Sequence, residues 1–177
     1  MLAWAITLAQ LTSAAGGATD PADLFSRPLG LPLLEARLED VERVLGHANV
    51  RDEDAFVCYV APTKDVLVRF VLDYLGTERR IGGFTMRALS GAAAAPCAVL
   101  EQAAEARARL IVGGLSLGMT RPEVIRILGP GPQWPDGRLF RQFTGADRDI
   151  VISARFQDDR LMELNIFAGW RRSTIMR

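Results

Sequence analysis

The stretch GLSLGMTRPEVIRILG, residues 114–129, decides the fold that the sequence predicts. Thr120 and Glu123 have the spacing of a helix capping box, and Pro122 lies in the first turn, where its missing N–H costs nothing. Gly129 has the place of a residue that ends a helix in the left-handed conformation, and the two prolines that follow prevent continuation. This stretch therefore predicts a short amphipathic helix that stops at Gly129.

An earlier stretch, LPLLEARLEDVERVLG at residues 31–46, aligns with residues 114–129 without a gap. It has apolar residues at helical spacing, and it also ends in glycine. Five of the sixteen aligned positions are identical: Leu34 and Leu117, Val41 and Val124, Arg43 and Arg126, Leu45 and Leu128, Gly46 and Gly129. Such self-similarity predicts two duplicated units.

Strands are predicted after each helical stretch, because apolar and polar residues alternate there. They cover residues 55–62, 65–75 and 81–89 in the first half and residues 138–143, 150–156 and 161–168 in the second. The turn Gln157–Arg160 would join the last two as a hairpin. The fold class expected is α+β, with two tandem units of helix and antiparallel three-stranded sheet. The units occupy residues 19–90 and 114–177, and a linker at residues 91–113 contains a helix over Ala98–Ile111.

The N-terminal residues 1–18 have the pattern of a secretory signal peptide. No charged side chain precedes Asp20, the apolar run Leu2–Leu11 is too short to span a membrane, and small residues follow it. The alternative is an apolar helix that stays in the fold. No cysteine ends the run, so no lipid anchor is expected. The prediction is a soluble protein exported to the periplasm or the outside of the cell.

Cys58 and Cys97 are the two cysteines of the chain, and in an oxidising compartment they would pair. The loop they close would stabilise the fold by roughly 3 to 4 kcal/mol in the chain-entropy model. The alternative is two separately buried thiols. No CxxC spacing is present, which argues against redox catalysis and a zinc knuckle.

The run LGMTRPEV at residues 117–124, then ILG at 127–129 and Asp136-Gly137, resembles the start of the small lipoproteins of the barrel-assembly machinery, the SmpA/OmlA group. That group is similar to the beta-lactamase inhibitory protein, which holds two helix-helix-strand-strand-strand units in tandem. The resemblance implies this tandem fold. Its matched positions are capping and core residues, so it implies no partner and no partner-binding residue.

Composition narrows the function classes. The chain has 177 residues, 21 basic and 21 acidic, and this neutrality argues against nucleic-acid binding. His47 is the single histidine, which excludes a multi-histidine metal site, and no GxSxG motif is present. We therefore expect no catalytic residue, no metal and no cofactor. The alternatives are a hydrolase that uses only carboxylates and a structural envelope protein without a specific partner.

The candidate site is the sheet face opposite the helices, where arginine and aromatic residues mix as they do in interface hot spots. The alternative is an ordinary solvated face. The function expected is an exported protein-binding module, either an inhibitor of a secreted enzyme or an accessory in envelope assembly, that docks its partner on this face. The residues predicted for it are Arg69, Asp73, Thr85, Arg87, Arg141, Arg155, Glu163, Asn165, Phe167 and Trp170.

Overall fold

A computed structural model describes residues 20–48, 55–61, 65–72, 78–89, 97–100 and 110–171. Within these ranges no helix has the length and apolar character needed to cross a membrane. The predicted signal peptide lies outside them. The elements in chain order are α1 (Pro21–Phe25), a 3₁₀ turn η1 (Pro28–Gly30), α2 (Leu38–Leu45), β1 (Phe56–Val60), β2 (Val66–Leu72), β3 (Ile81–Ala88), β4 (Ala98–Val99), α4 (Arg121–Leu128), β5 (Leu139–Thr144), β6 (Arg148–Gln157) and β7 (Arg160–Trp170).

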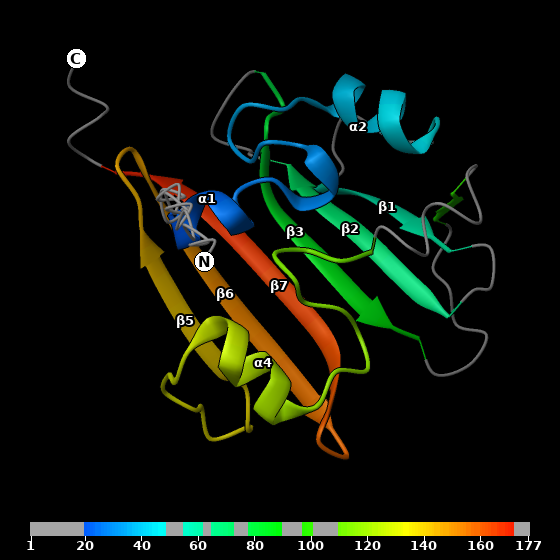
Figure 1. The fold of residues 1–177 in the computed structure, drawn as a ribbon. Helices are drawn as coiled ribbons and strands as arrows, with labels where there is room; N and C mark the ends of the chain where they lie inside the picture. Colours follow the sequence, from blue (N-terminus) through cyan, green and yellow to red (C-terminus); the bar gives the residue numbers. More distant parts are fainter. Residues whose placement is uncertain are drawn as a thin grey trace, which may run out of the picture.

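The strands form one seven-stranded sheet in the order β4-β1-β2-β3-β7-β6-β5 (Figure 1). The prediction of two units with a three-stranded sheet each is therefore wrong. β3 and β7 join the two halves as antiparallel neighbours, from Gly83 opposite Phe167 to Arg87 opposite Glu163. Two separate small sheets would each leave an unpaired edge at this position, and pairing the edges satisfies their N–H and C=O groups and builds one larger core. The internal repeat stays a prediction.

The six long strands lie where alternation predicts them, and the hairpin between β6 and β7 turns at Asp158 and Asp159. Both aspartates have positive φ, as a two-residue hairpin turn requires. The linker departs from the prediction. Ala98 and Val99 form β4, which pairs in parallel with β1, instead of starting a helix. Residues 101–109 of that predicted helix lie outside the described part of the chain.

The disulfide predicted between Cys58 and Cys97 is present, with an S–S distance of 2.06 Å. Cys58 lies in β1, and Cys97 directly precedes β4. The bond therefore ties the short parallel strand β4 to its neighbour. The strand pairs with β1 at two positions only, Tyr59 with Ala98 and Val60 with Val99, so backbone pairing alone stabilises it little.

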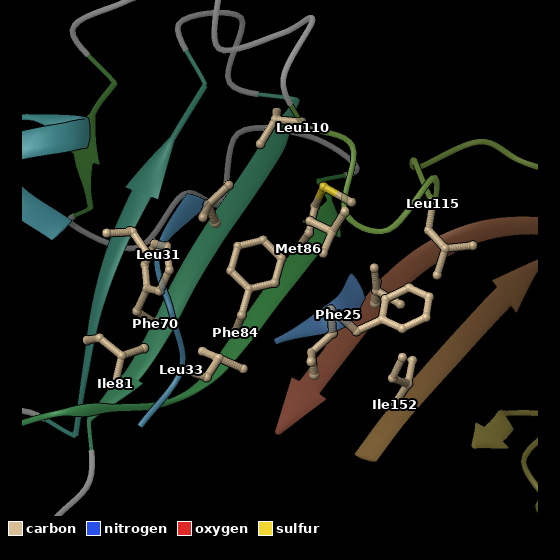
Figure 2. Close-up of a cluster of buried hydrophobic side chains, with 14 of the residues drawn as sticks. Phe25, Leu31, Leu33, Phe70, Ile81, Phe84, Met86, Leu110, Leu115 and Ile152 are labelled. Atoms are coloured by element: carbon tan, nitrogen blue, oxygen red, sulfur yellow. The ribbon is translucent and has the colours of Figure 1, made fainter. Parts of the chain in front are cut away.

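The helices α1, α2 and α4 all pack on one face of the sheet, which we call the covered face (Figure 1). Phe25 of α1, Val41 of α2 and Val124 of α4 are buried in one cluster with the inward side chains of the strands. Figure 2 shows Leu33 beside Phe84 and Phe25 beside Ile152. The core is thus continuous across both halves of the sheet.

Both longer helices start with a carboxylate that accepts a hydrogen bond from the backbone N–H of the N-cap residue. In α4 the donor is Thr120, 2.8 Å from Glu123 Oε2, so the predicted capping box is present. The same N–H bond, followed by the Thr120 hydroxyl, holds the pKa of Glu123 below its usual range. In α2, which is shorter than predicted, the pair is Arg37 and Asp40.

The helix α2 starts only at Leu38 because the backbone before it makes hydrogen bonds to β3. Leu34 has a left-handed φ of 69°, and its N–H donates to the Ile81 carbonyl at 2.7 Å. Ile81 in turn donates its N–H to the Ala36 carbonyl. Residues 32–36 therefore form a turn beside the start of β3, in which the Ala36 N–H donates to the Pro32 carbonyl at 2.8 Å. Leu31, Leu33 and Leu34 of this segment are buried. Helical spacing alone could not distinguish this segment from a helix.

Candidate functional site

The second face of the sheet, which we call the open face, carries the side chains that alternate with the core residues. Strand register places them in rows that cross the sheet at right angles to the strands. The charged row is Leu67, Arg87, Glu163 and Arg155; the polar row is Arg69, Thr85, Asn165 and Ser153; the apolar row is Phe56, Val71, Gly83, Phe167 and Val151. No helix of the described part of the chain covers these rows, since α1, α2 and α4 pack on the other face (Figure 1).

Hydrogen bonds link the centre of the polar row across three strands. The Thr85 hydroxyl donates to Asn165 Oδ1 at 2.8 Å. Asn165 Nδ2 donates to Ser153 Oγ at 3.3 Å and to Glu163 Oε1 at 3.0 Å. Each side chain is fixed by a neighbour on another strand, so this part of the open face is ordered in advance of any contact.

In the charged row, the Glu163 carboxylate has hydrogen-bond donors, whereas the Arg87 guanidinium has no carboxylate partner among the described residues. Arg155 Nη2 lies 3.2 Å from Glu163 Oε2, and Asn165 donates to the other carboxylate oxygen. Both oxygens of Glu163 therefore have a donor. Arg87 lies opposite Glu163 in the register, yet within the described ranges it makes no hydrogen bond or ion pair.

Arg69 of the polar row is held by an aromatic ring. Its guanidinium carbon lies 4.2 Å from the ring centroid of Phe56, a cation–π contact. Its Nε is buried and has no hydrogen-bond partner. Arg69 and Arg87 thus present two cationic groups, on adjacent strands, that no carboxylate of the described residues neutralises.

The apolar row is exposed at its two phenylalanines. Phe167 is 42% exposed and Phe56 is 38% exposed. Gly83 lies between them in the row and is itself buried, because the Phe167 ring lies over it: a Cβ at Gly83 would be 2.6 Å from Phe167 Cδ1. The absence of a side chain at Gly83 leaves the space that the Phe167 ring occupies. The alternation of apolar and polar residues did not predict this contact, because a glycine does not indicate which face it lies on.

A further aromatic pair was missed by the sequence analysis. Phe140 of β5 faces the same side as Ser153, and Trp134 stacks on it with ring centroids 5.7 Å apart. Trp134 is 49% exposed. It lies in the proline-rich segment before β5, where periodicity gives no information, although an exposed tryptophan in a turn is itself a signal of a contact surface.

Two of the predicted site residues belong to the covered face, and this part of the prediction is wrong. Arg141 lies opposite Ile152, and its Nε donates to the Leu128 carbonyl at 2.9 Å. Trp170 lies within β7, opposite Arg148, whose guanidinium is 5.4 Å from the indole ring. Alternation from the buried Leu139, Leu164 and Ile166 places both on the covered face, where Trp170 is nevertheless 40% exposed at the end of β7. Asp73 lies outside the described residues.

The remaining predicted residues, Arg69, Thr85, Arg87, Arg155, Glu163, Asn165 and Phe167, do share the open face. In the described ranges no three His, Cys, Asp or Glu side chains gather as a metal site would require. The carboxyl pKa shifts resolved for these ranges, at Asp40, Glu78, Glu123 and Asp147, are all downward. The largest cause of each lowered pKa is a hydrogen bond from an arginine side chain or from a backbone N–H.

Comparison with known proteins gives no family. No family model matches the chain, and no curated protein matches it. Among solved structures it is similar to a DUF4309 family protein, YjgB, from Bacillus subtilis, at 14% sequence identity and a TM-score of 0.46, over 84% of this chain and 97% of that one. A likeness of this size carries no argument about fold or function.

Proposed function

We propose that the protein is exported to the periplasm or the outside of the cell and binds another protein with its open face. The observation that carries the proposal is the composition and order of that face. It combines exposed aromatic rings, arginines without a carboxylate partner and a hydrogen-bonded polar centre on interior strands of one sheet. Aromatic residues and arginine are the types enriched at the centres of protein interfaces.

The location rests on two features that support each other. Residues 1–18 have the pattern of a signal peptide, and the Cys58–Cys97 disulfide is a bond that persists in oxidising compartments. A partner would then be a secreted enzyme that the protein inhibits or a component of envelope assembly. Either partner would meet the protein outside the cytoplasm.

The mechanism we propose is rigid docking. Side chains on interior strands have little freedom to lose on binding, since their backbone is hydrogen-bonded on both sides and several are bonded to one another. Phe167 and Arg87 lie on β7 and β3, near the middle of the sheet order, where the energetically dominant residues of an interface usually cluster. We expect these two residues to contribute most of the binding free energy.

The test is capture from an envelope extract of the source organism, followed by affinity measurement on the purified partner. The baits are the native protein, an Arg87→Ala/Phe167→Ala variant, and a control Arg126→Ala variant altered at an exposed arginine of α4. We expect the open-face variant to lose at least ~10-fold in affinity, equivalent to about 1.4 kcal/mol, and the control to bind normally. A partner that binds all three baits equally would contradict docking on the open face.

A further inference from the structure

We propose that the occupant of the open face is an amphipathic α-helix of the partner, apolar along one side and acidic along the other. It lies across the strands, with its apolar side on Phe56 and Phe167 and its carboxylates on Arg69 and Arg87. This inference rests on the proposed function and names the chemistry of the partner segment. It follows from the order of the rows, the state of the arginines and the hydrogen bonding of the strands.

The rows are ordered by polarity along the strands. From the Phe56 end of β1 toward the Val60 end, the apolar row comes first, then the polar row, then the charged row. Neighbouring rows are two residues apart, about 6.7 Å, so the apolar and charged rows are about 13 Å apart. The five strands β1, β2, β3, β7 and β6 span about 19 Å at the usual spacing of neighbouring strands. One helix, about 10 to 12 Å wide with its side chains, would cover that width, and about 13 residues would cover the span.

The backbone of these strands favours a helix as the occupant. β2, β3, β7 and β6 are interior strands whose N–H and C=O groups already bond to neighbours on both sides. An extended segment laid on this face would find no backbone partner and would bury its own polar groups at a cost. A helix bonds its own backbone internally, so it can meet the face through side chains alone.

The charges favour an acidic helix. Glu163 has a donor at each oxygen and cannot also serve Arg87, and Arg69 keeps a buried Nε without a partner. A carboxylate can bond a guanidinium with two parallel hydrogen bonds, which makes it the natural complement of both arginines. Arg69 lies opposite Thr85, two residues from Arg87, so the two are diagonal neighbours on adjacent strands, about 7 to 8 Å apart. Carboxylates three or four residues apart on a helix have nearly this spacing.

The experiment is selection of phage-displayed 16-residue peptides of helix-forming composition, randomised at the surface positions, against the folded native protein. Enriched peptides are then synthesised, and their affinity is measured against the native protein, Arg69→Ala/Arg87→Ala, Arg87→Ala alone, Phe167→Ala and the control Arg126→Ala. Thermal unfolding of each variant shows that it is folded, and Arg87→Ala retains the contact between Arg69 and Phe56.

We expect enriched peptides to carry Asp or Glu three or four residues apart beside an apolar stripe. Their affinity should fall at least ~10-fold in the double arginine variant and measurably in Arg87→Ala, fall again with added salt, and remain normal in Arg126→Ala. Peptides without paired acids, peptides indifferent to the arginines, or no enrichment at all would overturn the acidic helix. Peptides that ignore the arginines but lose affinity in Phe167→Ala would leave docking on the open face intact, whereas indifference to Phe167→Ala as well would remove both.

Discussion

The two faces of the sheet differ in burial: the covered face holds most of the core, and the open face carries the side chains that we propose for binding. On the covered face Phe70, Phe84, Met86 and Ile166 are fully buried under the helices. On the open face most of the residues next to them in the chain are charged, hydrogen-bonded or half-exposed, whereas Gly83 is buried under the Phe167 ring. A single strand serves both, because successive side chains point to opposite sides. The core of this protein is therefore mainly one-sided, although Val60 and Leu67 of the open face are also buried. Substitutions at the exposed positions of the open face can thus alter recognition at little cost to folding.

The phenylalanines Phe84 and Phe167 give the largest contrast between the faces. Phe84 is buried and meets the Phe70 ring edge-on at 5.3 Å, so Phe84→Ala should lower the free energy of unfolding by about 3 to 5 kcal/mol. Phe167 covers Gly83 but is 42% exposed, and Phe167→Ala should cost on the order of 1 kcal/mol or less. Urea unfolding followed by tryptophan fluorescence measures both. Equal losses for the two variants would contradict a one-sided core.

Removing the disulfide would test whether the stability of the sheet at the β1 end of the open face depends on a covalent bond. Cys58 lies on that face beside Arg69, and its bond to Cys97 holds the edge strand β4. Cys58→Ala/Cys97→Ala should lower the free energy of unfolding by about 3 to 4 kcal/mol. Hydrogen exchange should accelerate more in β1 than in β6, which is remote from the bond in the sheet order. The native protein under reducing conditions is the matched control and should behave like the variant. Unchanged stability in both would show that β4 and β1 hold together without the bond.

Much of the local structure could be predicted because it depends on neighbours in the chain. The strands, the hairpin at Asp158 and Asp159, the cap of α4 and the glycine that ends it all follow from alternation, turn chemistry and capping. The disulfide was predicted from the number of cysteines and from the oxidising compartment that the N-terminal pattern predicts. Apart from the disulfide, these features depend only on residues close together in the chain, and the structure confirms all of them.

The joining of the two halves could not be predicted from the same signals. Nothing in the sequence of β3 or β7 says that each is the other's neighbour, since both have the alternation of any half-buried strand. Likewise, residues 31–36 have helical spacing, but the hydrogen bonds of Leu34 and Ala36 with Ile81 hold them in a turn beside β3. The predicted placement of Arg141 on the open face was wrong for a different reason, because the alternation from Leu139 through Phe143 places it on the covered face.

Arg141 and Arg155 give the smallest but most direct contrast, because the sequence had placed the two arginines on one face. Arg141 donates to the Leu128 carbonyl at the end of α4 and lies 5.5 Å from the Phe143 ring centroid, so Arg141→Ala should lower the free energy of unfolding by about 1 to 2 kcal/mol. Arg155 is half-exposed and pairs with Glu163 at the surface, so Arg155→Ala should cost under ~1 kcal/mol. Thermal and urea unfolding of the two variants in parallel would separate them. Partner affinity should show the opposite order, with Arg155→Ala weakening binding and Arg141→Ala leaving it normal. If Arg141→Ala weakened binding without loss of stability, the covered face would have a part in recognition, and the division between the two faces would fail at β5.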